Sequence, residues 1–276
     1  MPPLSPLHAE RSGELLRQAR AGDRAALEEL IGGLADGVYR IALRMTASVP
    51  DAEDATQEIL QKVADRLASF RGEASLPTWT YRIAVNHLLD RKRSQVEELA
   101  LDFERFGADL LDGLAVAPDS EPVLAEEVKL GCTLAMLTCL DREHRVAYVL
   151  GEVFDLPGQA AADVAQVESA TYRQRLSRAR RQVEAFTESY CGLVNRDAPC
   201  ACDRRVSRAK DLGRIGGDRL PLSAHPRREL EAAVREMEGL HAAAALLRSH
   251  PHYRAPEQAV ALLREALLRA DLALLR

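Results

Sequence analysis

The stretch from 169 to 182 combines apolar residues at helical spacing with a dense run of arginine. It reads SATYRQRLSRARRQ and holds five arginines and no acid, although the whole chain carries a net charge of −5. A single helix face is expected to collect the apolar residues Tyr172, Leu176, Ala179, Val183 and Phe186. A helix that buries one stripe and surrounds it with guanidinium groups suits an anionic polymer. A solvated amphipathic helix is the alternative for a charge run taken alone.

The residues before this run favour a helix-turn-helix. Two short helical patterns cover 145–154 and 158–165, and residues 166–168 separate them from the arginine run. Ser169 is predicted to cap the helix that follows, through its hydroxyl. In a helix-turn-helix the second helix lies in the DNA major groove, where Arg favours guanine and Gln favours adenine. The side chains expected to reach bases or phosphates are Thr171, Arg173, Gln174 and Arg178.

The rest of the composition favours helices and excludes a membrane protein. Hydrophobic residues make up 47% of the 276 residues but aromatic residues only 4%, and alternating strand patterns are missing. We therefore predict an all-α fold. The first residues lack a signal-peptide pattern, and no stretch approaches the ~20 apolar residues of a membrane span. We expect a cytoplasmic protein without membrane association, whose five cysteines are reduced unless they bind metal or sense oxidants.

Charge divides the chain into four parts. Between 95 and 127 there are ten acidic residues and one basic residue. We predict a helical unit at 12–94, an acidic linker at 95–124 with a short helical piece, a second helical unit at 125–190, and an extension at 191–276. The linker is either a solubilising tether or an acidic segment that occupies or shields a basic surface meant for nucleic acid.

The first helical unit contains a polar helix face. Asp51, with Asp54 three residues later, is predicted to cap a helix that runs to about Leu67. Acids and amides gather on the side opposite its apolar stripe. Such a face is either solvated or docks onto a basic partner. Its candidate docking residues are Asp54, Gln57, Glu58 and Gln61.

An aromatic and basic block follows that helix. Phe70 and Arg71 open a loop, and Pro77 is predicted to begin the next helix. That helix ends in the cations of 91–93, which favour a helix C-terminus. Aromatic residues beside a basic helix can stack on unpaired bases. For Trp79, a place in the core is the alternative.

These blocks together resemble a known family. DAEDATQEILQKVADRLASFRGEASLPTWTYRIAVNHLLDRKRS, followed by LDREHRVAYVLGEVFDLP and SATYRQRLSRARR, resembles bacterial sigma factors of the sigma-70 family, in particular the small extracytoplasmic-function (ECF) class. The resemblance covers about residues 14–190. It implies two small helical domains, a region 2 bundle and a region 4 helix-turn-helix, joined by the acidic linker and followed by a helical C-terminal extension.

The resemblance also implies a role for each block. Region 2 would bind core RNA polymerase and the −10 promoter element, the linker would resemble a segment that threads the polymerase's RNA-exit path, and region 4 would read the −35 element. The core-binding residues would be Asp54, Gln57, Glu58 and Gln61. The −10 residues would be Phe70, Arg71, Trp79, Asn86, Arg91 and Arg93. The −35 residues would be Thr171, Arg173, Gln174, Arg175, Arg178 and Arg181, with Arg145 on the phosphates. Gln166 departs from the family, because a glycine often makes that turn.

The extension carries further candidates. Cys191, Cys200 and Cys202 lie within twelve residues and either bind zinc, act as a redox switch or only pack; no fourth zinc ligand is evident and no other cofactor is expected. Helical patterns at 228–249 and 256–275 either fold back on the two units as a built-in regulator, recruit a separate one or only add stability.

The expected function is promoter recognition together with core RNA polymerase, in the bacterial cytoplasm and associated with the nucleoid, and an anti-sigma factor is a further expected partner. One alternative is a stand-alone helix-turn-helix regulator, and another is a redox- or metal-responsive interaction protein. An enzyme is not predicted, because the sequence has no glycine-rich phosphate loop, no HExxH and no triad pattern.

Overall fold

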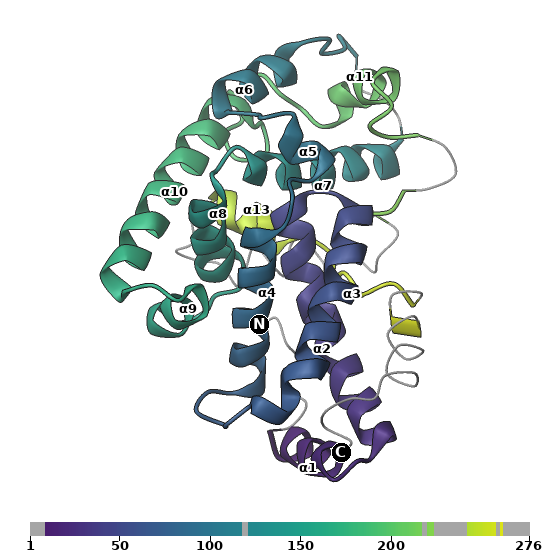
Figure 1. Ribbon diagram of the computed structural model, residues 1–276. Helices are drawn as coiled ribbons and strands as arrows, with labels where there is room; N and C mark the ends of the chain where they lie inside the picture. The colour runs from purple at the N-terminus through teal and green to yellow at the C-terminus, as the bar shows by residue number, and fades with distance from the viewer. Residues whose placement is uncertain (1–8, 118–120, 217–219, 224–241, 258–259, 262–276) are drawn as a thin grey trace.

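The computed structural model describes residues 9–117, 121–216, 220–223, 242–257 and 260–261. Every regular element in these ranges is helical, and a single isolated β-bridge joins Cys191 to Cys200 there (Figure 1). The predicted all-α fold is confirmed. No described helix combines the length and the apolar character that crossing a bilayer requires.

Four helices build the first unit: α1 (Ala9–Arg20), α2 (Arg24–Thr46), α3 (Val49–Arg66) and α4 (Leu76–Asp90), with a 3-10 turn, η1 (Leu67–Ser69), after α3. The long α2 is buried over most of its length and lies between its neighbours (Figure 1). Asp23 caps α2 by accepting a hydrogen bond from the Ala26 N–H at 3.1 Å. The side chains of α2 therefore form the centre of this unit's core.

The first residues of α3 and α4 test two predictions: the predicted cap of α3 is wrong, and the predicted start of α4 is confirmed. Ser48, not Asp51, caps α3, because the helix begins two residues before Asp51 and the Ser48 Oγ accepts from the Asp51 N–H at 3.4 Å. Asp51 instead binds Arg91, with 3.0 Å between Oδ1 and Nη1. α4 begins as predicted, with Pro77 in its first turn and Ser75 as its cap.

The acidic segment folds into short helices that pack on the rest of the chain. α5 (Gln95–Glu98) starts with a capping box between Ser94 and Glu97, and α6 (Phe103–Leu111) follows. The ring of Phe106 stacks on Phe186, with 5.4 Å between centroids. A Cβ on Gly107 would lie 2.5 Å from the Tyr190 ring, so this close approach needs glycine. The segment is thus a packed connection between the two units.

The second unit comprises α7 (Pro122–Thr138), α8 (Arg142–Tyr148), the π-helix η2 (Val149–Val153), α9 (Gly158–Ala165) and α10 (Ser169–Tyr190). The turn between α9 and α10 places Gln166 in the left-handed region, with φ 54°. The Ser169 cap prediction is wrong: Glu168 occupies the cap position without a side-chain bond, and the Ser169 hydroxyl donates to Gln159 Oε1 at 2.7 Å. α9, the turn and α10 form the predicted helix-turn-helix.

The extension continues through η3 (Asp203–Arg205) and α11 (Val206–Asp211) to α13 (Ala242–Arg248). Of the predicted helix 228–249, only 242–249 lies among the described residues, and 242–248 is helical there. The predicted helix 256–275 lies almost entirely outside the described residues.

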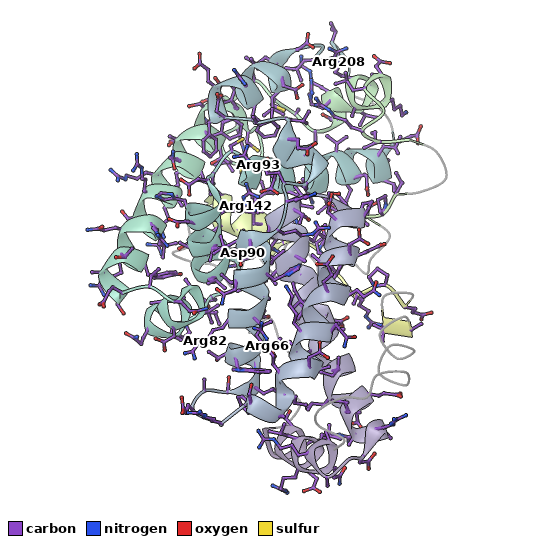
Figure 2. The ribbon with its side chains drawn as sticks, in the orientation of Figure 1. Arg66, Arg82, Asp90, Arg93, Arg142 and Arg208 are labelled. Atoms are coloured by element: carbon purple, nitrogen blue, oxygen red, sulfur yellow. The ribbon has the colours of Figure 1, made fainter. Side chains whose placement is uncertain are left out.

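Arginines of the extension hold the acidic segment. Asp109 binds Arg214 through both carboxylate oxygens, at 2.6 and 2.8 Å, and Asp112 binds Arg208, which Figure 2 labels at the α11 end of the molecule. The Arg204 Nε donates to the Ala115 carbonyl at 2.7 Å. The basic surface that neutralises these acids is therefore part of the same chain.

Candidate nucleic-acid interface

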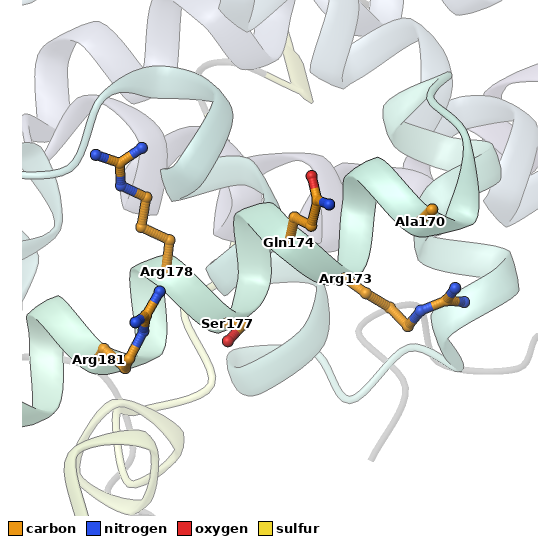
Figure 3. A pocket seen from close by; sticks show the side chains of 6 residues that line it. All are labelled: Ala170, Arg173, Gln174, Ser177, Arg178 and Arg181. Carbon is orange, nitrogen blue, oxygen red and sulfur yellow. The ribbon is translucent and has the colours of Figure 1, made fainter.

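One exposed face of α10 gathers the polar side chains that the sequence singles out. A shallow, open depression runs along the helix, and Figure 3 shows its lining side chains: Ala170, Arg173, Gln174, Ser177, Arg178 and Arg181. We call Arg173, Gln174, Arg178 and Arg181, all exposed, the arginine face. No ion pair within the described part of the chain holds its three arginines. Their guanidinium groups are thus available to an anionic ligand.

The opposite side of α10 is fixed to its own unit. Tyr172, Ala179, Val183 and Phe186 are buried as predicted, and Leu176 packs against them half-buried. The Tyr172 hydroxyl donates to the Ala147 carbonyl at 3.0 Å. A Cβ on Gly151 would lie 2.7 Å from that hydroxyl, so the close approach of η2 to α10 needs glycine here. The helix therefore presents a fixed surface.

Two of the five arginines in the run are used inside the protein. Arg175 pairs with Glu143 at 2.5 Å, and Arg180 pairs with the buried Glu152. Thr171 is half-buried at the start of α10. The structure thus brings Arg173, Gln174, Arg178 and Arg181 together on one surface, while Arg175 is held by an ion pair to Glu143 of α8.

Arg145 is not a phosphate-binding residue in this structure. Only 2% of it is exposed, and its Nη1 lies 2.8 Å from Glu97 Oε1. The same group also donates to the Met45 carbonyl, and Nη2 donates to the Leu140 carbonyl at 3.0 Å. The prediction for Arg145 is wrong because a charge pattern alone does not reveal that this side chain points into the protein, toward Glu97.

Arg142, which the sequence did not single out, joins the two units at the same place. Its Nε and Nη2 donate to both oxygens of Glu97, at 3.0 and 2.9 Å. Its Nη1 also donates to the carbonyls of Leu89 and Arg91 at the end of α4, near Asp90 and Arg93 in Figure 2. Burial raises the pKa of Glu97, but the hydrogen bonds from Arg142 and the Ser94 N–H, with the charge of Arg145, outweigh it and lower that pKa. Glu97 is therefore ionised and fully bonded.

The predicted −10 residues divide into an exposed and an internal group. Arg71, Asn86 and Arg93 are exposed. Phe70 is only 7% exposed and packs on the half-buried Trp79, with 5.3 Å between ring centroids. Arg91 is bound to Asp51. The side chain of Phe70 is thus part of the core in this conformation and does not face a base.

The polar face of α3 is present as predicted. Asp54 and Glu58 are exposed, and Gln57 and Gln61 are half-buried. The Gln61 amide donates to Asp65 at 2.9 Å. This surface lies along one helix and stays open to a partner.

The three cysteines of the extension, for which zinc binding, a redox role and simple packing are the alternatives, do not form a metal-ligand cluster among the described residues. Among the described residues, no three His, Cys, Asp or Glu side chains are placed to hold a metal ion together. Cys200 and Cys202 instead line, with Cys132 of α7, a largely apolar cavity of about 790 Å³. Burial raises the pKa of Cys200 to about 11 and that of Cys202 to about 12, so both thiols are protonated at neutral pH.

Comparison with known proteins points to one family. Residues 30–97 match sigma-70 region 2. "ECF RNA polymerase sigma factor SigE" of Mycolicibacterium smegmatis is 32% identical over 173 residues, which is 60% of this chain and 64% of that protein. "ECF RNA polymerase sigma factor SigW" of Bacillus subtilis is 26% identical over 60% of this chain and 90% of its own length. "RNA polymerase sigma-H factor" of Pseudomonas aeruginosa is 27% identical over 64% of this chain and 94% of its own length.

A solved structure described as "Structure of CnrH in complex with the cytosolic domain of CnrY" is also similar, at 20% identity over 65% of this chain and 97% of that chain, with a TM-score of 0.47. The matched segment of SigE is just under two thirds of that protein. The region 2 match covers the buried α2, the polar face of α3 and most of α4, and the relatives carry the same family name. Residues 30–97 of this chain are thus similar to sigma-70 region 2, and about 60% of the chain is similar to sigma factors of the extracytoplasmic-function subfamily.

Proposed function

We propose that this chain directs core RNA polymerase to promoters by reading the −35 element with α10 and the −10 element with the end of α4 and the loop before it. The observation that carries the proposal is the arginine face, which stands exposed on the second helix of a helix-turn-helix. A recognition helix contacts base edges with residues near its N-terminus, and Arg173 and Gln174 lie in its first turns. Arg178 and Arg181 continue the face toward the flanking phosphates.

Region 2 supplies the other contacts. The polar face of α3, through Asp54, Gln57, Glu58 and Gln61, is our candidate surface for core polymerase, because it is charged, polar and open. Arg71, Asn86 and Arg93 are the exposed candidates for the −10 element. Melting DNA costs about 1.4 kcal/mol per base-pair step in lost stacking. A binding protein offsets that cost by holding bases and phosphates of the separated strand, without making or breaking bonds.

Run-off transcription tests this function. Purified core polymerase with the wild-type chain selects promoters from a library, and Arg173→Ala and Arg178→Ala are then compared on the selected promoters. We expect both variants to lose transcription where the −35 element is required. Arg196→Ala is the matched control, because Arg196 is also exposed but lies beyond the end of α10. Full activity of both variants would contradict the assignment of the arginine face.

A stand-alone helix-turn-helix regulator is separated from this proposal by gel shifts with and without core polymerase. The family proposal expects specific promoter binding with core only, and a stand-alone regulator would bind without it. The assignment to the cytoplasm and the nucleoid, and an anti-sigma factor as a separate partner, stay predictions.

A further inference from the structure

We propose that residues 242–257, the clamp segment, act as an intramolecular clamp that holds the two promoter-binding units of this chain in a closed arrangement. The proposal rests on the proposed function, because it concerns how that function is restrained. α13 packs against both α10 and η2, and the residues after it reach α2 and α7. One short segment thus contacts both units.

The centre of the contact is a buried cation between two rings. Arg44 of α2 is buried, with its guanidinium carbon 5.5 Å from the ring centroid of Phe154 and 5.8 Å from that of Tyr253. Phe154 follows η2 in the second unit, and Tyr253 belongs to the clamp segment and has no exposed surface. Three separate parts of the chain therefore meet at Arg44, and this meeting point is the junction.

Polar contacts fasten the clamp segment on each side of the junction. On the first unit, the Ala255 N–H donates to Asp36 Oδ1 of α2 at 2.9 Å. On the second unit, Arg248 donates to the Glu152 carbonyl and lies 3.2 Å from Asp155 Oδ1. His250 Nε2 lies 2.6 Å from the Thr133 hydroxyl of α7. Pulling the two units apart requires the loss of contacts on at least one of these sides.

The closed arrangement places the helix-turn-helix on the helix proposed to engage the −10 element. The Arg82 Nε of α4 donates to the Asp163 carbonyl of α9 at 3.0 Å, and Tyr81 contacts Phe154 with 5.8 Å between ring centroids. Figure 2 labels Arg82 where α4 and α9 meet. Asn86 lies four residues after Arg82, so both side chains emerge on one face of α4. Nucleic acid that follows this face meets α9 while the protein is closed.

In the part of the chain that the structure describes, the junction contains a buried cation without a carboxylate partner, and this lowers the cost of separating the parts that meet there. Arg44 is buried, and among the described residues no carboxylate pairs with it. Its Nη1 donates to the Arg40 carbonyl at 3.2 Å, while its Nε has no hydrogen-bond partner there. A buried cation without a counter-ion is costly, and two aromatic faces offset that cost only in part. Opening rehydrates Arg44, whereas an all-apolar seam gains nothing of this kind.

Tyr253→Ala in the full chain tests the clamp, with Arg254→Ala, an exposed neighbour, as the matched control. Hydrogen exchange of the α4 and α9 peptides reports opening, and run-off transcription with core polymerase reports its consequence. We expect Tyr253→Ala to raise exchange in α4 and to increase run-off severalfold at limiting chain concentration. Arg254→Ala should match the wild type in both measurements.

Asp36→Ala provides a second route, because it removes the partner of Ala255 from the other side of the contact. Asp36→Ala replaces Tyr253→Ala as the test of the clamp if circular dichroism shows that Tyr253→Ala has lost helical structure. A folded variant with unchanged exchange and unchanged run-off would overturn the clamp. Increased exchange in a chain whose wild type never supports run-off would leave the clamp standing and overturn the proposed function instead.

Discussion

The arginines of the second unit fall into two groups, one exposed and one internal, and the two groups have different roles. On α10, Arg173, Arg178 and Arg181 are exposed on one face, where guanidinium groups stay solvated until an anion arrives. At the start of α8, Arg142 and Arg145 are bound to Glu97 and to backbone carbonyls of the first unit. The exposed group is available to a ligand, and the internal group holds the two units together.

This difference shows why a basic sequence cannot be equated with a nucleic-acid surface. Arg145 and Arg178 are both arginines within helices of one small unit, but Arg145 is buried against Glu97 and backbone carbonyls, whereas Arg178 is exposed. A buried ion pair constrains geometry, whereas an exposed cation supplies affinity. Mutations should therefore separate the two groups by whether folding or promoter binding responds.

The largest expected effect belongs to Arg145→Ala. The change removes one donor to Glu97, which keeps Arg142 and the Ser94 N–H, and it takes the Arg145 donors from the buried carbonyls of Met45 and Leu140. We therefore expect the free energy of unfolding to fall by about 3–5 kcal/mol. Urea denaturation of the full chain measures it. Arg181→Ala, on the exposed face, should stay within about 0.5 kcal/mol of the wild type. Equal losses in both variants would remove the distinction between the two groups.

Arg178→Ala is expected to act on promoter binding alone. Loss of one contact to a base or phosphate costs about 1–3 kcal/mol of binding free energy, and a lost phosphate contact also reduces the salt slope of binding by about one. Titration of the polymerase holoenzyme on a promoter at several salt concentrations measures both quantities. An unchanged affinity combined with a lower stability would place Arg178 with the internal group.

His250 gives the clamp segment a pH dependence. Burial, followed by the charges of Arg44 and Lys129, lowers the pKa of His250 well below its ordinary value of 6.5; the hydroxyls of Thr133 and Tyr253 are its hydrogen-bonding neighbours. An opened or unfolded chain therefore binds a proton that the closed chain does not, so stability rises with pH and is lost as pH falls below 6.5. The contribution of His250 to this slope reaches at most about 1.4 kcal/mol per pH unit.

Stability measured between pH 7 and pH 5 checks this. His250→Gln should reduce the slope in that window, because glutamine does not titrate there. The buried His87, whose pKa burial also lowers from 6.5, keeps its own contribution in both proteins. Glu97 does not interfere, since its pKa is lowered from 4.5 and its contribution is lost only at more acidic pH. A slope that is identical in His250→Gln and the wild type would exclude His250 as its source.

The sequence predicted the parts of this molecule that depend on local spacing. The apolar stripe of α10, its exposed arginines and the start of α4 at Pro77 all follow from helical periodicity and turn chemistry. The Asp51 cap was wrong by three residues, because Ser48 is an equally good cap and Pro50 is accepted in the first turn. Local rules do not choose between two capping residues that lie three positions apart.

What the sequence did not predict are contacts between distant segments. The bond between Arg142 and Glu97 spans 45 residues and that between Ala255 and Asp36 spans 219, and neither leaves a local pattern. Phe70 shows the same limit, because its place in the core is set by packing against Trp79 and by its loop's position after α3. The sequence showed that segment 95–124 is acidic, but it did not predict that arginines of the extension bind its carboxylates.

The smallest expected effect comes from Glu143→Gln, which tests Arg175, one of the two half-buried arginines of α10 that pair within the protein. Arg175 is half-buried and pairs with the exposed Glu143, so solvent screens the pair and its loss should cost at most about 0.5 kcal/mol of unfolding free energy. The change also removes a negative charge beside the arginine face and releases Arg175, so promoter affinity should rise slightly. Denaturation and holoenzyme titration measure the two quantities. A loss of more than 1 kcal/mol in stability with no gain in affinity would assign Arg175 to the internal group with Arg145. The internal group would then include an arginine of α10 and would not be confined to α8.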